Sequence, residues 1–282
     1  MKNKTIIILL SIIILIILLI FYLNYENNSL QISNYEIINN KLSKEFNDYK
    51  IIQVSDFHNT KSEKLTNDLI DEIKKQKPDI IVITGDLIDS RKTDIEIAIN
   101  FIKKIKDIAP VYFISGNHEA RIINYEKLKN EMIDNGVIIL DNKTKIIESK
   151  NSKLNLLGID DPSMAYESFV ADEEIIKVEI NNLEYDKNNF TILLSHRPEV
   201  SNVYVKSEID LVLTGHAHGG QIRIPFIGGL IAPNQGLFPK YTSGVFEEKQ
   251  TTMIVSRGIG NSILPHRVNN KPELVIITLK TK

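Results

Sequence analysis

Short apolar runs rich in β-branched residues recur along the chain from residue 49 onward, and each run fits a strand buried inside a sheet. Stretches with apolar residues at helical spacing lie between the first three runs, and a further helical stretch is ended by Gly136. The predicted strands cover residues 51–55, 79–84, 110–115, 153–158, 190–195 and 210–215, and the predicted helices cover 61–76, 94–108 and 124–135. Strands that alternate with helices predict βαβ units and a mostly parallel sheet.

Three later runs, at residues 221–224, 251–255 and 273–279, have no helices between them, and we expect edge or hairpin strands there. Two sheets placed between layers of helices accommodate all of these elements. We therefore expect residues 49–282 to form one α/β domain, which is long enough to bury a substantial core.

The N-terminal segment has a different pattern. Residues 5–23 form an uninterrupted run of nineteen uncharged, mostly apolar residues, preceded by Lys2 and Lys4. A helix of this length spans roughly 28 Å, close to the thickness of a bilayer hydrocarbon core. A cleaved signal peptide is the alternative, but the apolar run is long for one and no small-residue cleavage site follows it. We expect residues 1–23 to be a single transmembrane anchor.

The residues that flank this run predict its orientation and its connection to the domain. Lys2 and Lys4 before the run, and Glu26 after it, favour a cytoplasmic N-terminus and a domain outside the cytoplasm, held at the cell membrane. Residues 24–48 are polar and rich in Asn, and we expect them to be a tether with one short strand near residues 35–38.

Composition excludes several kinds of chemistry. Cysteine is absent, which excludes disulfides, thiolate nucleophiles and Cys-based metal sites. The formal net charge is −2, so the chain lacks the basic surplus typical of proteins that bind nucleic acids, and we expect no nucleic-acid partner.

Polar residues follow five of the predicted strands directly. In chain order these are Asp56 and His58, then Asp86, then Asn117, His118 and Glu119, then His196, and finally His216 and His218. The chain has six histidines, and only His266 lies outside these groups. Because ligands of open α/β sheets bind beyond the carboxyl ends of the strands, we expect these side chains to meet at one rim.

Each group alone has an ordinary explanation as a turn or a helix cap. Five such groups, each placed after an apolar strand, instead indicate a metal site. Carboxylate, carboxamide and imidazole ligands suit Mn²⁺, Fe or Zn²⁺, and a carboxylate can bridge two ions roughly 3.5–4 Å apart, which can clamp the oxygens of a displacement at phosphorus.

The order D-x-H, GD-x-x-D, GNHE, a lone strand-end His and GHxH resembles the calcineurin-like metallophosphoesterase superfamily over about residues 50–282. The segments GHAHGGQIRIP, GIDDP and SRGIG resemble its membrane-associated branch, which contains YkuE-like and UDP-2,3-diacylglucosamine pyrophosphatase-like proteins. The resemblance implies a four-layer α-β-β-α sandwich with two metal ions at its rim.

The resemblance also implies roles for single residues. The first ion would be bound by Asp56, His58, Asp86 and His218, and the second by Asp86 as the bridge with Asn117, His196 and His216. A hydroxide activated by both ions would be the nucleophile. His118 matches the family's catalytic histidine that binds no metal, and Glu119 is expected only to hold neighbouring groups.

Substrate contacts follow from residue type and position. Four of the six arginines, Arg121, Arg197, Arg257 and Arg267, lie near the strand-end motifs. A guanidinium suits phosphate oxygens, although surface salt bridging is the ordinary role of any one of them. Phe226, Ile227, Leu230 and Ile231 either line a groove for acyl chains or pack against the sheet.

The sequence therefore predicts a metal-dependent phosphoesterase that hydrolyses a phosphoester or pyrophosphate bond with two divalent ions, Mn²⁺ preferred. The anchor favours a lipid-linked substrate, because it raises the local concentration of membrane substrates at the site. The alternatives are a nucleotide or nucleic-acid phosphodiesterase of the same superfamily and a metal-binding module without catalysis.

Overall fold

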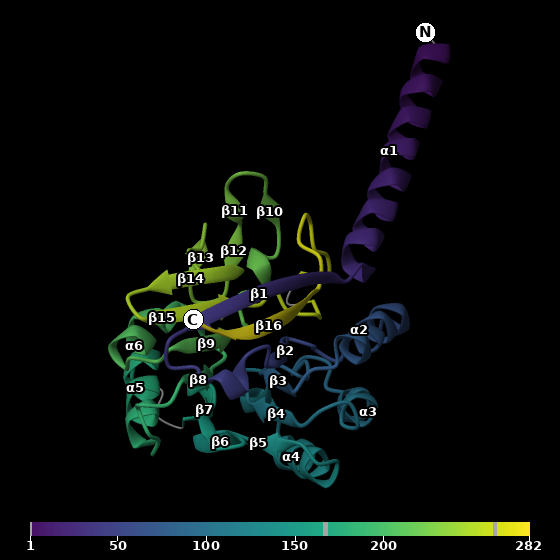
Figure 1. The fold of residues 1–282 in the computed structure, drawn as a ribbon. Coiled ribbons are helices and arrows are strands. Elements are labelled where there is room, and N and C mark those ends of the chain that lie inside the picture. The colour runs from purple at the N-terminus through teal and green to yellow at the C-terminus, as the bar shows by residue number, and fades with distance from the viewer. Residues whose placement is uncertain (1, 166–168, 262–263) are drawn as a thin grey trace.

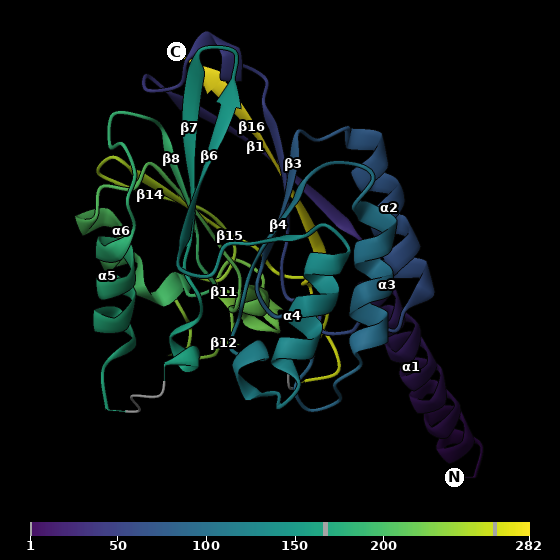
Figure 2. The same cartoon turned by 90° about the horizontal axis from the view of Figure 1, so that it is seen from below.

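The structure is a computed structural model that describes every residue except 1, 166–168 and 262–263. Two six-stranded sheets pack face to face, and helices cover both outer faces (Figure 2). The first sheet contains, in spatial order, β1 (Gln31–Asn39), β16 (Glu273–Thr281), β2 (Lys50–Val54), β3 (Ile80–Thr84), β4 (Val111–Ile114) and β5 (Ile138–Ile139). The second contains β14 (Gly244–Glu248), β15 (Thr251–Val255), β9 (Leu211–Thr214), β8 (Thr191–Leu194), β7 (Ser152–Gly158) and β6 (Lys143–Ser149).

Most neighbouring strands are parallel; the antiparallel pair of the first sheet lies inside it, and those of the second sheet lie at its edges. Strands β2 to β5 run parallel, whereas β16 is antiparallel to β2. Strands β7, β8, β9 and β15 run parallel, and β6 and β14 are antiparallel to their neighbours. Helices α2 (Glu63–Gln76), α3 (Ile95–Ile105) and α4 (Tyr125–Asp134) cover the first sheet, and α5 (Asp172–Asn182) and α6 (Ser201–Lys206) cover the second. The expected four-layer α-β-β-α sandwich is confirmed.

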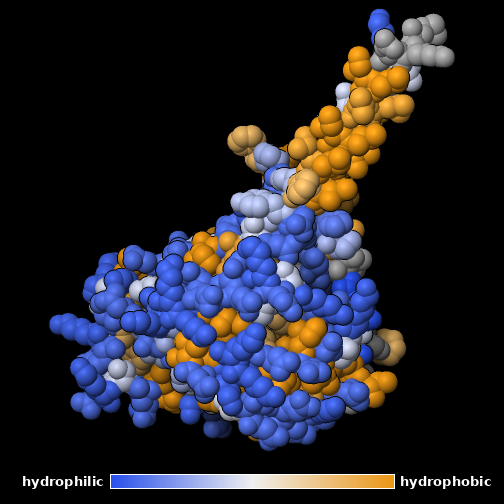
Figure 3. Space-filling model, turned by 90° about the vertical axis from the view of Figure 1, so that its right-hand side faces the viewer, coloured by the Kyte–Doolittle hydropathy of each residue, from blue (hydrophilic) through white to orange (hydrophobic). Residues whose placement is uncertain are grey.

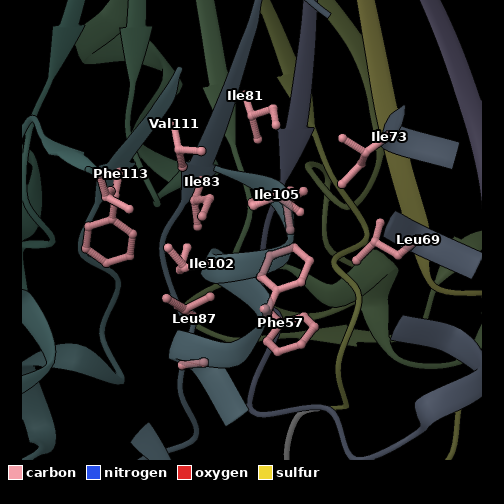
Figure 4. Packing of buried hydrophobic residues seen from close by; sticks show 14 of the residues in the cluster. Phe57, Leu69, Ile73, Ile81, Ile83, Leu87, Ile102, Ile105, Val111 and Phe113 are labelled. Carbon is pink, nitrogen blue, oxygen red and sulfur yellow. The ribbon is translucent and has the colours of Figure 1, made fainter. Parts of the chain in front are cut away.

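The central strands are apolar on both faces because each face meets another layer. In β3, Ile81 and Ile83 pack toward the helices with Phe57 and Ile102 (Figure 4), while Ile80 and Val82 pack between the two sheets. Full burial of such a side chain stabilises the fold by about 1.5–3 kcal/mol. This two-sided packing fixes where each strand ends and therefore where the strand-end side chains lie.

Helices α2 and α3 begin at side-chain caps that the sequence supplies. The Ser62 hydroxyl accepts the N–H of Leu65, and the Asp94 carboxylate accepts the N–H of Ile97. Such caps satisfy backbone donors that would otherwise lack partners, each worth about 1 kcal/mol. The two helices therefore begin at Glu63 and Ile95, two residues and one residue after the predicted starts.

Residues 24–48 do not form the expected tether. Helix α1 (Lys2–Asn28) continues through the first of them, and β1 pairs in parallel with β16 along its whole length, from Gln31 opposite Glu273 to Asn39 opposite Thr281. Phe46, in the short turn that follows, is only 1% exposed. The segment looked like a linker because an edge strand carries polar residues, and its partner lies at the other end of the chain.

Helix α1 projects from the domain (Figures 1 and 3), and none of the 18-residue apolar window within Lys4–Asn28 is buried. This window has a mean hydropathy of 3.6, and the helix is long and apolar enough to cross a membrane. Two small hairpins, β10 (Arg223–Ile224) with β11 (Gly228–Gly229) and β12 (Ile231–Ala232) with β13 (Gly236–Leu237), project from the same side of the domain (Figure 1).

Candidate metal centre

The carboxyl ends of β2, β3, β8 and β9 bring six of the predicted ligands into two overlapping groups. Within each group, one potential ligand atom per residue lies within 4.8 Å of the others. Asp86 belongs to both groups. The first contains Asp56, His58, Asp86 and His218, and the second contains Asp86, His196 and His216.

In the first group, imidazole nitrogens and carboxylate oxygens converge. The Nε2 atoms of His58 and His218 lie 3.1 Å apart, and His218 Nε2 lies 3.2 Å from Asp56 Oδ1. His58 Nε2 is also 3.6 Å from Asp86 Oδ2. Burial lowers the pKa of His58 to about 3 in spite of the opposing effect of Asp86, so its imidazole is neutral, as a metal ligand must be.

In the second group, His196 is held with one ring nitrogen free. Its Nδ1 donates to the carbonyl oxygen of Thr84 at 2.7 Å, and its Nε2 lies 3.3 Å from Asp86 Oδ2. A backbone partner on one nitrogen orients the other toward a metal. Burial alone would lower the pKa of His196, but the Asp86 carboxylate raises it to about 10. The negative charge of the carboxylates therefore favours a cation at this position.

Among the described residues, four atoms of the predicted ligands are buried without a hydrogen-bond partner: His58 Nδ1, Asn117 Oδ1, His196 Nε2 and His218 Nδ1. Asn117 follows β4 and is only 4% exposed. Buried polar atoms rarely lack a hydrogen-bond partner, so each atom without one requires an explanation, such as a bound ion. Oxygen and nitrogen donors without partners, next to a shared carboxylate, fit a centre for divalent cations.

The backbone at these positions is strained. Five of the seven predicted ligands have φ between 47° and 65°: Asp56, His58, Asp86, His216 and His218. This left-handed region is uncommon for residues other than Gly, and each case costs of order 1–3 kcal/mol. Strain of this kind clusters at functional sites, where the surrounding structure maintains it.

Two glycines allow the chain to approach the carboxylates closely. A Cβ atom on Gly116 would lie 2.3 Å from Asp86 Oδ1, and one on Gly215 would lie 2.4 Å from Asp56 Oδ2. Any larger residue would displace a predicted ligand, because the neighbouring atoms are buried. The glycines that precede Asn117 and His216 are therefore part of the site.

Glu119 joins the two loops that carry Asp86 and Asn117. Its buried carboxylate accepts the backbone N–H groups of Asp86 at 2.9 Å, Gly116 at 2.8 Å and Ile88 at 3.2 Å. Burial and the nearby Asp86 raise the pKa of Glu119 to about 8. These contacts give Glu119 the holding role that the sequence predicts.

His118 lies beside the two groups with one nitrogen facing them. Its Nδ1 accepts the N–H of Ser90 at 2.9 Å, and its Nε2 lies 4.0 Å from Asp86 Oδ2. Burial lowers the pKa of His118, so the ring is neutral with its proton on Nε2. The Nε2 side of the ring is therefore the side that lies near Asp86.

Two of the four predicted substrate arginines are committed to other contacts. Arg267 is 1% exposed and donates to the backbone carbonyls of Gly260 and Arg257. Arg197 is 3% exposed and forms a two-pronged ion pair with Asp161, at 2.5 and 2.8 Å. These contacts occupy both guanidinium groups within the fold, and a role for either of them in substrate binding stays a prediction.

The other two arginines differ in their surroundings. Arg257 donates to the side chain of Gln31 in β1 at 3.0 Å and lies 3.9 Å from Glu273, so it also acts within the fold. Arg121 is exposed, three residues after His118, and its role in substrate binding stays a prediction.

The sequence did not identify two supporting residues. Asp161 holds Arg197, whose Nη1 lies 3.3 Å from His216 Nε2. Asn270 donates to the backbone carbonyls of His218 at 2.8 Å and Gln221 at 3.0 Å. Asp161 belongs to the GIDDP segment, so this motif could have identified it as a supporting residue. No motif in the local sequence identifies Asn270.

Two adjoining cavities lie next to the predicted ligands. One, of about 420 Å³, begins at His58 and is lined by three cationic side chains, Lys61, Arg91 and Lys92, and by Asp89, which forms an ion pair with Arg91 at 2.8 Å. The other, of about 590 Å³, shares Lys61 and is lined at its far end by Ile20 and Leu23 of α1. The rim is therefore connected to the end of the apolar helix.

Known proteins share these features. A family model for the calcineurin-like phosphoesterases matches residues 49–220. The uncharacterized metallophosphoesterase YkuE of Bacillus subtilis (strain 168) is 30% identical over 241 residues, which cover 84% of this chain and 80% of YkuE. The phosphodiesterase YaeI of Escherichia coli (strain K12) is 27% identical over 249 residues, 82% of each chain.

The fold has solved counterparts. The crystal structure of TT1561 of Thermus thermophilus superposes with a TM-score of 0.52 at 12% identity, over 75% of this chain and 90% of that one. A likeness at this identity supports the fold, while the family match supports the chemistry. The chain belongs to the calcineurin-like phosphoesterase family and is a hydrolase that acts on phosphoester bonds.

Proposed function

We propose that this protein is a membrane-anchored hydrolase that uses two divalent metal ions, preferably Mn²⁺, to cleave a phosphoester or pyrophosphate bond of a lipid-linked substrate. The observation that carries the metal assignment is the position of Asp86, which belongs to both groups of ligand atoms. Asp56, His58 and His218 complete one metal site, and Asn117, His196 and His216 complete the other. Two bound cations would supply an activated water and a positive clamp for the phosphoryl group.

The residues around the ions have separate tasks in this proposal. Glu119 and the N–H groups that it accepts hold Asp86 in place, and Arg197 orients His216. His118 donates its Nε2 proton to the departing oxygen or to a phosphoryl oxygen. Lys61, Arg91 and Lys92 attract the anionic group of the substrate to the cavity beside His58.

The lipid part of the proposal is supported by the adjoining cavities. The cationic cavity at His58 continues into a second one that is lined by Ile20 and Leu23, which belong to the apolar stretch of α1. An amphiphile fits this arrangement, with its phosphate at the rim and its chain toward the bilayer. With a cytoplasmic N-terminus, the site lies outside the cytoplasm.

The hydrolase activity is tested on the full-length protein in detergent, stripped of metal and supplied with Mn²⁺, with bis-p-nitrophenyl phosphate as the substrate. Asp86→Asn should lower kcat at least about 100-fold, while the control Asp71→Asn, an exposed position on α2, should match the wild type. Equal rates for wild type and Asp86→Asn would refute the metal-dependent mechanism.

The lipid preference is tested separately on vesicles. Wild-type protein is reconstituted with phospholipids and offered either lipid phosphoesters or soluble nucleotides at equal total concentration. We expect faster hydrolysis of the lipid class, and faster hydrolysis of soluble nucleotides would refute the lipid part while leaving the hydrolase assignment unchanged.

A further inference from the structure

The β10–β11 hairpin exposes large apolar side chains at its tip. Phe226 is 108% exposed and Ile227 is 64% exposed, and the next hairpin adds Leu237 at 67% and Phe238 at 59%. The sequence left open whether this segment packs against the sheet, and the structure shows that its tip does not. Contiguous exposed apolar groups mark a surface with a partner.

The hairpin has a fixed position relative to α1. The Asn269 backbone N–H donates to the Tyr22 hydroxyl at 3.1 Å, and the Asn269 side chain donates to the carbonyl of Arg223, at the base of β10, at 3.2 Å. The backbone N–H of Arg223 in turn donates to the carbonyl of Val268 at 2.9 Å. One short segment, residues 268–270, therefore holds both the end of the apolar helix and the hairpin.

The hairpin and the helix point the same way. In Figure 1, the hairpin and α1 project from the same side of the domain, and the hairpin tip reaches the level of the lower part of α1. Lys271 lies over the ring of Tyr25 at 4.5 Å, a pairing typical of the level where a helix leaves a bilayer. A bilayer crossed by α1 would therefore reach the hairpin tip.

The charges around the hairpin suit a lipid surface. No Asp or Glu occurs from Gly215 to Phe246, although the chain contains 36 acidic residues, whereas Arg223 and Lys240 lie in this segment. Anionic lipid head groups would meet no carboxylate from these residues, and the aromatic and aliphatic tip suits the boundary between head groups and acyl chains.

We propose that the β10–β11 hairpin is a second membrane contact, with Phe226 and Ile227 inserted into the bilayer that α1 crosses. The inference rests on the anchor of the proposed function. The chain enters β10 only a few residues after His218, and Arg223 Nη1 donates to the carbonyl of Gly219 at 2.9 Å. Insertion of the tip therefore fixes the height of the His218 loop above the lipid.

The absence of tryptophan from the chain makes single-Trp variants local reporters. Full-length Phe226→Trp is reconstituted into vesicles of phosphatidylcholine and phosphatidylglycerol with either normal or brominated acyl chains. We expect a blue-shifted emission and roughly twofold quenching by the brominated lipid, since the tip reaches the acyl boundary. Ile133→Trp on α4, 49% exposed and far from the hairpin in Figure 1, should show neither effect.

Two further variants keep the outcomes distinct. Ile12→Trp reports on α1: if it is quenched and Phe226→Trp is not, the hairpin inference is wrong and the anchor stands. If Ile12→Trp is also unquenched, both are refuted. Ile227→Trp repeats the test should Phe226→Trp fail to fold. Quenching does not depend on catalysis, so an inactive site would leave this result unaffected.

Discussion

The ion pair of Asp161 and Arg197 gives the sharpest energetic prediction. Both side chains are buried, at 0% and 4% exposure, and the two contacts are 2.5 and 2.8 Å long. Asp161→Asn keeps the volume but leaves the buried guanidinium without its main counter-charge, a change that typically costs 3–5 kcal/mol. Glu199 remains 3.4 Å from Arg197, so we expect the lower end, about 3 kcal/mol.

A loss of about 3 kcal/mol corresponds to a fall in Tm of roughly 6–12 °C for a domain of this size. Thermal unfolding is followed on the full-length protein in detergent without added metal, because a bound ion would add its own stabilisation. The control is Asp68→Asn, which removes one partner of the exposed pair with Lys64 and should change stability by less than about 1 kcal/mol.

A double variant separates the charge effect from the loss of packing. Asp161→Asn combined with Arg197→Met removes both charges of this pair, and it should be more stable than Asp161→Asn alone, since no buried guanidinium remains without its main counter-charge. If Asp161→Asn unfolds at the same temperature as Asp68→Asn, the reasoning about this buried pair is wrong.

Three other predictions concern the site itself. His118→Ala should lower kcat about 10²–10⁴-fold without changing the metal content, which would separate its role from that of a ligand. Gly116→Ala, whose Cβ would meet Asp86 Oδ1 at 2.3 Å, should weaken metal binding at least about tenfold in a titration. Burial raises the pKa of Glu119 to about 8, so its contribution to stability is present at low pH and is lost as pH rises toward 8. Glu119→Gln should therefore reduce the decline in stability of the metal-free protein between about pH 4.5 and 8.

The position of the metal site could be predicted from the sequence because the apolar runs identify the strands and because ligands bind beyond the carboxyl ends of parallel strands. Apart from Lys50, the strands before Asp56, Asp86 and His196 are buried, so their apolar runs are unambiguous, and parallel strands end at one edge. Asp86 was identified as the shared ligand only through the family resemblance, and the structure places it where two groups of atoms meet.

The predictions that failed depend on contacts between distant parts of the chain. The pairing of β1 with β16 joins residue 31 to residue 273, and no local pattern encodes it. Residue type alone could not show that backbone carbonyls already surround the Arg267 guanidinium. Asn270 could not be predicted because the residue that it contacts, His218, lies 52 positions away in the sequence.

The central claim, that Asp86 is shared by two cations, is tested most directly by the metal content and the electron paramagnetic resonance spectrum of the Mn²⁺-loaded protein. We expect two ions per wild-type chain and the spectrum of a magnetically coupled pair, because a bridging carboxylate keeps the ions roughly 3.5–4 Å apart. Asp86→Asn should lose this coupling. A wild-type protein that binds one ion per chain, or two ions that show no coupling, would contradict the account.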